Sequence, residues 1–337
     1  MKRIAFILLF LTCTVHAGNI PDKTYTPQPR MRVIIDNDFS GDPDGLFQLV
    51  HHMLSPSVDI RGIIGSHLTA HAGFDNSGNS AEKACRKAET VLKTMGIRPV
   101  FPIIEGAPGP MTDIGSPIES DGAALIIKEA LRTDTDMPLY VVCGAGLTNV
   151  ASAFLLCPEI QDRFTLIWIG GQEYDALPPP GHSIPEYNLN LCIPAAQVVF
   201  NQSKISIWQV PRNAYRQCIY SVSELMTDIY PCGKTGEMLA GEILGLMAEL
   251  KQYGNRMGEV YIMGDNPLVL LTALQTGFEP DPASSHDQMR QAPFITSEGT
   301  YRHRPDGRWI RVYDLLDNRL MFKDLVSKLK LFTEPKR

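Results

Sequence analysis

Four aspartates fall within nine residues, and they are the strongest chemical signal in the sequence. They are Asp36, Asp38, Asp42 and Asp44, and an apolar run at residues 31–35 precedes them. Carboxylates crowded at the end of a buried strand repel one another unless a cation neutralises them. Their oxygens suit Ca²⁺, and Mg²⁺ less well, whereas the absence of nearby His or Cys argues against zinc or copper. The alternative interpretation is a solvated acidic turn that only caps a helix.

Apolar strands and amphipathic helices alternate on either side of this acidic run. Residues 31–35 resemble a buried parallel strand, and residues 45–54 have helical spacing, with Asp42 as the cap and Pro43 at the first position. Further strands are expected at 60–65, 100–104, 139–143 and 165–170, helices at 80–95, 123–131, 149–156, 195–201, 236–253, 267–274 and 322–329, and an edge hairpin at 301–312. This order predicts an α/β fold with an open, mainly parallel sheet and helices on both faces. Ligands in such folds bind beyond the carboxyl ends of the strands.

The overall composition is that of a globular protein with a sizeable core. The chain has 337 residues, of which 44% are hydrophobic and 20% charged. No linker rich in Pro, Ser or Gly divides its middle, so we expect a single domain over residues 18–337. The net charge is −6, from 31 basic and 37 acidic residues mixed along the chain. This mixture argues against polymeric nucleic acid as a partner.

Residues 1–17 have the features of a signal peptide. Two basic residues precede an apolar stretch at residues 4–15, and a small-residue cleavage site ends at Ala17. The stretch is shorter than the roughly 20 residues of a membrane-spanning helix, and no later run is long and uncharged enough. We therefore predict an exported protein, periplasmic or secreted, with no transmembrane segment. A lipid anchor on Cys13 is disfavoured because a threonine is a poor residue before a lipidated cysteine.

Six cysteines remain after the predicted leader, an even number that export would allow to pair. Cys143 and Cys192 lie in apolar surroundings typical of buried free thiols. Cys218 and Cys232 flank a loop and are the only pair that we consider for a disulfide.

Four blocks of sequence, taken in order, resemble the inosine/uridine-preferring nucleoside hydrolases. Residues 33–44, which contain the four aspartates and Gly41, are similar to the family signature Asp-x-Asp-x-Gly-x-Asp-Asp. The other blocks are residues 142–149 with 168–171, similar to Thr-Gly-Gly-Leu-Thr-Asn and Met-Gly-Gly, residues 186–188 with 194–196, similar to Glu-Phe-Asn and Pro-Glu-Ala-Ala, and residues 264–267, similar to a late His-Asp-Pro. The resemblance implies the family's α/β fold and hydrolysis of ribonucleosides to free base and ribose.

The resemblance also implies a Ca²⁺ site. Asp38 matches the residue that binds the metal and activates the attacking water, so it is the predicted general base. Asp44 and Asp265 match further metal carboxylates. Gly144 matches a position whose backbone carbonyl is a ligand, a role that does not depend on the side chain. Asp36 is expected to orient these ligands from behind.

Another set of residues is implied to hold the sugar. Asp42 resembles the acid that binds the 2′-hydroxyl, Glu186 and Asn188 match residues that hold other ribose oxygens, and Asp265 also contacts a hydroxyl. Cleavage of an N-glycosidic bond passes through an oxocarbenium-like state. A positioned water and nearby carboxylates are the groups that such a reaction needs.

The sequence departs from the family at three places. Pro43 is inserted between the paired acids, so either Asp42 or Asp44 could be the one that binds metal. Gly264 stands where the family has a His that helps the base to depart. Residues 177–182 replace a loop that donates an Asn to the sugar.

Several side chains are candidates for the base end of the site. Three histidines are candidates for the missing acid: His67, His71 and His182. Three aromatic side chains are candidates for stacking on the base: Trp168, Tyr174 and Tyr187. A lone histidine or a strand aromatic is more often part of the core. Thr148 and Asn149 are expected to cap the helix that follows them.

Three other functions are alternatives. An apolar strand followed by Asp-x-Asp also opens the haloacid dehalogenase phosphatases, but Ser40 stands where they need Thr or Val. A non-catalytic protein that binds a sugar or nucleoside through a metal would keep the same pocket, as would a hydrolase of another glycoside. For the hydrolase prediction and for the last two alternatives, the expected partner is a small-molecule nucleoside or related glycoside, and each is compatible with a homo-oligomer. Export would suit the salvage of purines and pyrimidines from extracellular nucleosides.

Overall fold

The computed structural model describes residues 25–70, 73–175, 178–179, 181, 184–276 and 285–333. The predicted leader with Cys13, together with His71 and His182, lies outside the described residues. The strands are β1 Met31–Asn37, β2 Val58–Gly65, β3 Ile103–Glu105, β4 Leu139–Cys143, β5 Thr165–Ile169, β6 Ser206–Val210, β7 Ile219–Ser221, β8 Val260–Ile262, β9 His286–Gln291, β10 Phe294–Ile295, β11 Tyr301–Arg302 and β12 Trp309–Leu315. The α-helices are α1 Asp44–Met53, α2 Ser80–Thr94, α3 Asp121–Ala130, α4 Thr148–Leu156, α5 Tyr187–Leu191, α6 Ile193–Gln197, α7 Arg212–Tyr215, α8 Val222–Glu224, α9 Gly233–Gln252, α10 Pro267–Leu270 and α11 Asn318–Thr333. A 3₁₀ turn, η1 Pro158–Asp162, and two π turns, η2 Val198–Gln202 and η3 Leu225–Ile229, complete the elements.

The main sheet has eight strands in the order β3-β2-β1-β4-β5-β6-β12-β9. Neighbours pair in parallel except β9, which runs antiparallel to β12 at the edge. All seven residues of β1 are buried, as expected for a central parallel strand covered on both faces. The predicted α/β fold with an open, mainly parallel sheet is confirmed.

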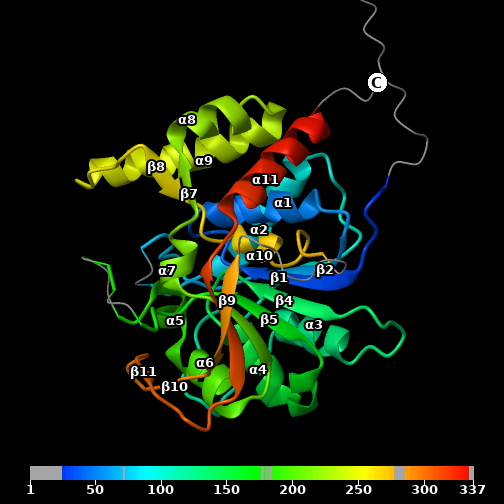
Figure 1. The fold of residues 1–337 in the computed structure, drawn as a ribbon, viewed down its shortest axis with the longest axis vertical. Helices are drawn as coiled ribbons and strands as arrows, with labels where there is room; N and C mark the ends of the chain where they lie inside the picture. The colour runs from blue at the N-terminus through cyan, green and yellow to red at the C-terminus, as the bar shows by residue number, and fades with distance from the viewer. Residues whose placement is uncertain are drawn as a thin grey trace, which may run out of the picture.

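Helices cover both faces of this sheet (Figure 1). The helices α1, α2, α9 and α11 lie on one side and α3, α4 and α6 on the other. Each layer has its own apolar core, because side chains alternate between the two faces of every strand. In β1, for example, Val33 and Ile35 belong to one core, and Ile34 belongs to the other.

One local prediction is wrong, and another differs only in the first residue of a helix. The expected hairpin at 301–312 does not form, because β11 pairs with β10 whereas β12 joins the main sheet beside β6. The alternating pattern predicted strands in this segment correctly, but such a pattern does not determine which strand each one pairs with. Helix α1 begins at Asp44 with Pro43 in the capping position. Asp42 lies one residue further from the helix, but its Oδ1 still accepts from the backbone N–H of Asp44 at 3.3 Å, as the predicted cap requires, and also from the hydroxyl of Tyr261 at 2.8 Å.

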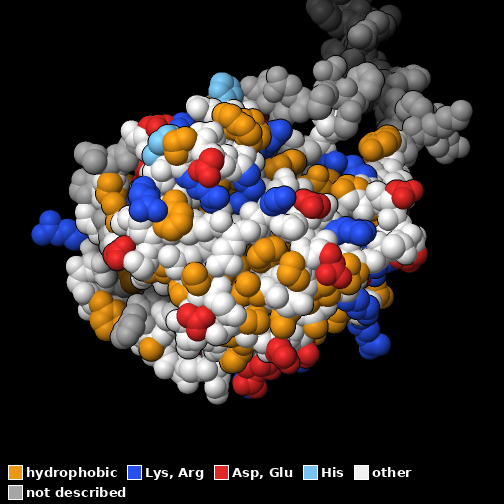
Figure 2. Space-filling model, turned by 90° about the horizontal axis from the view of Figure 1, so that it is seen from below, with side chains coloured by type: hydrophobic (Ala, Val, Ile, Leu, Met, Phe, Trp, Pro, Cys, Tyr) orange, Lys and Arg blue, Asp and Glu red, His pale blue; other side chains and the backbone are white. Residues whose placement is uncertain are grey.

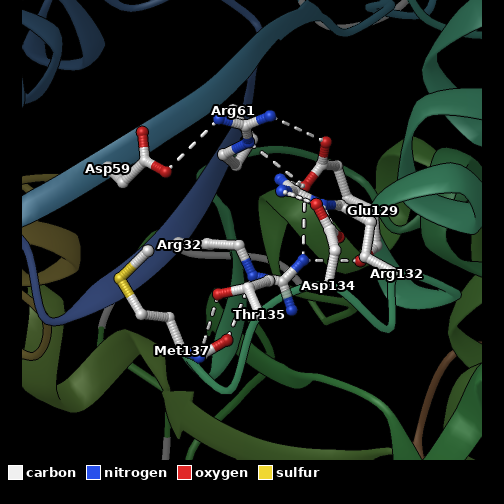
Figure 3. A network of polar contacts seen from close by, with 8 residues as sticks. All are labelled: Arg32, Asp59, Arg61, Glu129, Arg132, Asp134, Thr135 and Met137. Carbon is white, nitrogen blue, oxygen red and sulfur yellow. Dashed lines mark hydrogen bonds and ion pairs between the residues drawn. The ribbon is translucent and has the colours of Figure 1, made fainter.

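A buried charge network closes the amino ends of the strands (Figure 3). Arg32 Nη1 donates to the carbonyl of Glu129 at 2.6 Å and to its carboxylate at 3.2 Å, and Arg32 Nε donates to the carbonyl of Met137 at 3.0 Å. Arg61 and Arg132 bind the same carboxylate. This network joins β1, β2, α3 and the entry to β4, at the end of the sheet away from the acidic run.

The surface carries both signs of charge. On the face shown in Figure 2, acidic and basic side chains are interspersed with hydrophobic ones. The described helices include none with the length and apolar character needed to span a membrane. Cys218 and Cys232, the pair considered for a disulfide, are both free thiols.

Candidate functional site

A cavity of about 420 Å³ lies beyond the carboxyl ends of β1, β4 and β5. All of the residues predicted to hold metal or sugar line it: Asp38, Asp42, Asp44, Gly144, Glu186, Asn188 and Asp265. They come from four segments that are far apart in the chain. The parallel sheet brings them together, since the carboxyl ends of its strands meet at one edge.

Asp36 lies behind the cavity wall, as expected for an orienting residue. It is fully buried, and its Oδ1 accepts hydrogen bonds from the hydroxyl of Ser66 and from Asn149 Nδ2, the latter at 3.0 Å. Burial raises the pKa of Asp36 to about 6, against the lowering effect of these two donors. Asn149 also accepts from the backbone N–H of Ala107 at 2.8 Å. The prediction that Thr148 and Asn149 cap α4 is therefore wrong: the helix begins at Thr148 without a side-chain cap, and the amide of Asn149 connects Asp36 to a neighbouring loop.

Asn37 was not singled out in the sequence, yet it organises the site. Its Nδ2 donates to Asp265 Oδ2 at 2.9 Å and to Gln48 Oε1 at 3.3 Å. Two glycines make room for this contact. A Cβ on Gly144 would lie 2.6 Å from Asn37 Nδ2 and 2.7 Å from Asp265 Oδ2, and one on Gly45 would lie 3.0 Å from the same nitrogen. Any side chain at Gly144 would displace the pair.

Burial and mutual repulsion disfavour the ionised form of the aspartates in the cavity. Burial, followed by the charge of Asp265, raises the pKa of Asp38 and of Asp44 well above the usual range. Burial also raises the pKa of Asp42 to about 6 and that of Asp265 to about 7. Four carboxylates with raised pKa values in one cavity are an arrangement that a bound cation would stabilise.

Asp42 and Asp44, on either side of Pro43, have different hydrogen-bond partners, which distinguishes the two candidates for the metal ligand. Asp42 Oδ1 accepts from the hydroxyl of Tyr261 at 2.8 Å, on the β8 side of the cavity. Asp44 Oδ2 accepts from the backbone N–H of Asp265 at 3.1 Å. Asp44 is thus joined directly to the late aspartate, whereas Asp42 is held by a tyrosine.

Glu186 is fixed by three donors. Its Oε2 accepts from the backbone N–H groups of Gly171 at 2.7 Å and Leu189 at 3.1 Å, and its Oε1 accepts from the hydroxyl of Tyr215 at 2.8 Å. Burial raises the pKa of Glu186, and the backbone donors oppose that rise. The carboxylate is therefore held in one orientation at the cavity wall.

The donors of the cavity have the chemistry that a hard cation requires. In the described part of the chain, no three acidic, histidine or cysteine side chains already form a tight metal cluster. The carboxylates of Asp38, Asp44 and Asp265 nevertheless share the cavity with the backbone of Gly144. The hydrogen bonds to Asp44 and Asp265 come from neutral donors, a backbone N–H and an amide. These oxygen atoms fit Ca²⁺ rather than zinc or copper.

Comparison with known families agrees with this geometry. A sequence model of the inosine-uridine preferring nucleoside hydrolases matches residues 33–292. The chain belongs to this family. No curated protein sequence matches it significantly.

Solved structures of nucleoside hydrolases share the fold. A purine-preferring ribonucleoside hydrolase from Gardnerella vaginalis matches with a TM-score of 0.68 and 18% identity, over 90% of this chain and 99% of that one. An inosine-uridine preferring nucleoside hydrolase from Bacillus anthracis matches with a TM-score of 0.64 and 14% identity, over 89% and 99%. A plant nucleoside hydrolase matches with a TM-score of 0.64 and 17% identity, over 91% and 100%.

Gly264 marks the clearest departure of this nucleoside hydrolase family member from the expected pattern. A Cβ at this position would lie 3.2 Å from Tyr215 Cδ2 and 3.3 Å from Asp44 Oδ2. The ring of Tyr215 therefore occupies the space into which a side chain at position 264 would project.

Three of the candidates for the base end, His67, Trp168 and Tyr174, lie elsewhere. His67 is buried, its Nε2 lies 2.8 Å from Thr148 Oγ1, and burial lowers its pKa to about 4. Trp168 is wholly buried in the core, and the hydroxyl of Tyr174 donates to Gln209. Neither aromatic lines the cavity, whereas Tyr187 does.

Several lining residues were missed by the sequence analysis: Phe74, Arg212, Tyr215, Arg216 and Tyr261. They lie outside the four matching blocks, in the loop before α2, in and just after α7, and in β8. No local motif distinguishes them. They reach the cavity only because the loop before α2, the β6–β7 connection and β8 pack over the sheet edge.

Proposed function

We propose that the protein hydrolyses the N-glycosidic bond of ribonucleosides to free base and ribose, with Ca²⁺ as cofactor. The observation that carries this proposal is the meeting of Asp38, Asp44 and Asp265 with Gly144 in one cavity. These residues come from separate segments and supply only hard oxygen donors. Family membership makes the same reaction class the natural expectation.

In this proposal Asp38, Asp44, Asp265 and the carbonyl of Gly144 hold the cation. Asp44 is preferred to Asp42 because it is hydrogen-bonded to Asp265, whereas Asp42 is engaged by Tyr261. The chemistry that the cation supplies when bound is the acidification of water, which makes a nucleophile available at neutral pH.

The protein's own residues account for the other parts of the reaction. Asp38 takes the proton of the attacking water as general base. Asp42, Glu186 and Asn188 hold the ribose hydroxyls, with Asp265 as a further contact. Their negative charge also stabilises the oxocarbenium character that develops on the sugar ring. Asp36 acts only indirectly, by orienting the loop that carries Asp38.

The test is an assay of reducing sugar released from a panel of ribonucleosides, with Ca²⁺ or with a chelator. We expect release only with Ca²⁺, and a loss of at least about 100-fold in Asp38→Ala. The matched control is Asp59→Ala, which removes a partly exposed aspartate at the other end of the sheet. If calorimetry shows Ca²⁺ and nucleoside binding but no substrate is cleaved, the proposal is wrong and a non-catalytic binding protein is favoured.

We also propose that the protein acts outside the cytoplasm, on the basis of the leader-like residues 1–17. The full chain, expressed in a bacterial host, is then expected in the periplasm or medium with a new N-terminus near Gly18. Recovery of the uncleaved chain from the cytoplasm would contradict this proposal.

A further inference from the structure

Two tyrosines line the cavity from α7 and β8, and the hydroxyl of each is already hydrogen-bonded to a carboxylate. The hydroxyl of Tyr215 donates a hydrogen bond to Glu186 Oε1 at 2.8 Å, and the hydroxyl of Tyr261 donates one to Asp42 Oδ1 at 2.8 Å. Burial raises the pKa of both tyrosines. Gly264 has no side chain that could act as an acid. Neither this glycine nor the two tyrosines therefore supplies a proton to a departing base.

Arg212 and Arg216, in and just after α7, both line the cavity, and among the described residues only Arg212 has an ion-pair partner. Arg212 binds Glu173 through two hydrogen bonds of 2.8 Å and 2.7 Å, as a buried bidentate pair. Arg216 follows α7 directly, and its Nη1 is buried with no hydrogen-bond partner among the described residues. A buried N–H without an acceptor is unfavourable. Because Arg216 lines the cavity, a ligand there can supply that acceptor.

We propose that Arg216 is a catalytic residue that stabilises the departing base, in place of the histidine that Gly264 replaces. This inference rests on the proposed nucleoside hydrolysis. As the C1′–N bond breaks, both of its electrons stay with the base, and the guanidinium donates a hydrogen bond to the atom on which the charge collects. The water oxygen bonds to C1′ and its proton passes to Asp38. The base then takes a proton from solvent, and Asp38 returns its proton to solvent.

The chemistry of the guanidinium predicts which leaving groups depend on it. Arginine only donates hydrogen bonds and does not release a proton near neutral pH. It therefore suits a base whose negative charge spreads onto a carbonyl oxygen, as in hypoxanthine, and it does not suit the amino group of adenine. A 4-nitrophenolate leaving group is stable as an anion and needs no such help.

The experiment compares the wild type, Arg216→Met and Arg216→Lys on inosine, adenosine and 4-nitrophenyl riboside. We expect Arg216→Met to lower kcat for inosine by about 100-fold or more, and to change the rate with 4-nitrophenyl riboside by less than about fivefold. Arg216→Lys keeps the charge and should retain part of the activity. The matched control is Arg319→Met, which removes a largely exposed arginine of α11 and should change neither rate.

Two results would overturn the inference. One is an equal loss on all three substrates, which would indicate a structural role for Arg216, and the other is unchanged cleavage of inosine. If the wild type cleaves none of the substrates, the proposed function fails separately. Calorimetric binding of hypoxanthine then decides about Arg216: a loss of about tenfold or more in Arg216→Met supports base recognition, and equal binding excludes it.

Discussion

The side-chain amide of Asn37 lies 2.9 Å from Asp265 Oδ2, and so it connects the acidic loop to a carboxylate 228 residues further along the chain. Both side chains are buried, and Asn37 is also hydrogen-bonded to Gln48 in α1. The contact fixes the orientation of the late aspartate relative to β1. Mutation of residues that orient metal ligands in this way typically lowers metal affinity by about 10- to 100-fold.

Replacing Asn37 should therefore weaken the proposed metal site without removing a ligand. In Asn37→Ala, Asp265 loses its amide donor, and we expect the affinity for Ca²⁺ to fall by about 10- to 100-fold, measured by calorimetry. Asn190→Ala, at an exposed position of α5, is the matched control. Unchanged Ca²⁺ affinity in Asn37→Ala would show that the contact does not position a ligand.

Gly144→Ala tests the crowding of the cavity. The added methyl group would approach Asn37 Nδ2 and Asp265 Oδ2 to 2.6 Å and 2.7 Å, so one of them must move. We expect kcat/KM for nucleosides to fall by at least about 100-fold, because small displacements of reacting groups are costly. Gly109→Ala is the matched control, since a Cβ there meets nothing within 4 Å. Equal activity of the two variants would exclude the assigned role of Gly144.

Calcium binding should depend on pH. Burial raises the pKa of the proposed ligands Asp38 and Asp44 well above the usual range and that of Asp265 to about 7, so protons compete with Ca²⁺ for these carboxylates as the pH falls. We expect the affinity for Ca²⁺ to fall as the pH is lowered from about 8 to about 5. A calorimetric affinity that is constant over this range would contradict the proposed ligand set.

Asp42 and Asp265, whose pKa values are raised to about 6 and about 7, predict the pH dependence of stability when Ca²⁺ is removed. Their folded-state pKa values lie above those of the unfolded chain, so between the two values the folded state holds more protons. Their stabilising effect is complete below the unfolded pKa and is lost as the pH rises through about 6 to 7. In chelator, the decrease in Tm over this range should be smaller for Asp265→Asn than for the wild type. An identical decrease in both proteins would argue against this account.

Glu129→Ala should destabilise the fold and leave the chemistry intact. It removes the partner of the buried Arg32 at the amino ends of the strands, and leaving such a charge unpaired typically costs about 3–5 kcal/mol. We expect a lower free energy of unfolding in denaturant and an unchanged kcat for the folded fraction. Asp134→Ala, which removes an exposed member of the same network, should have little effect. Wild-type stability of Glu129→Ala would show that Arg32 finds another partner.

Tyr215→Phe should weaken binding of the ribose by Glu186. Loss of the hydroxyl removes one of the three donors that hold Glu186, and we expect kcat/KM to fall by about tenfold, mainly through KM. Tyr230→Phe, at an exposed position, is the control. A fall in kcat that matches the fall in kcat/KM would instead indicate that Tyr215 acts in the transition state.

The sequence by itself determined the fold class and the acidic part of the cavity wall. Continuous apolar runs such as residues 31–35 are a local property of strands buried on both faces, and the alternation with helices leaves few topologies. Polar residues that directly follow such strands must lie at the carboxyl edge of the sheet. For this reason the sequence places Asp38 and Asp44 at that edge, whereas the role of Gly144 is implied only by the family resemblance.

Only the tertiary structure decided which side chains meet across the cavity. The hydrogen bond from Asn37 to Asp265, the ring of Tyr215 beside Gly264 and the unpaired Nη1 of Arg216 all depend on segments that have no shared periodicity. The place of β12 beside β6 was decided in the same way. Local propensity and hydrophobic pattern determine which element forms and which face is buried, whereas the partner of each side chain is set by the packing of distant segments.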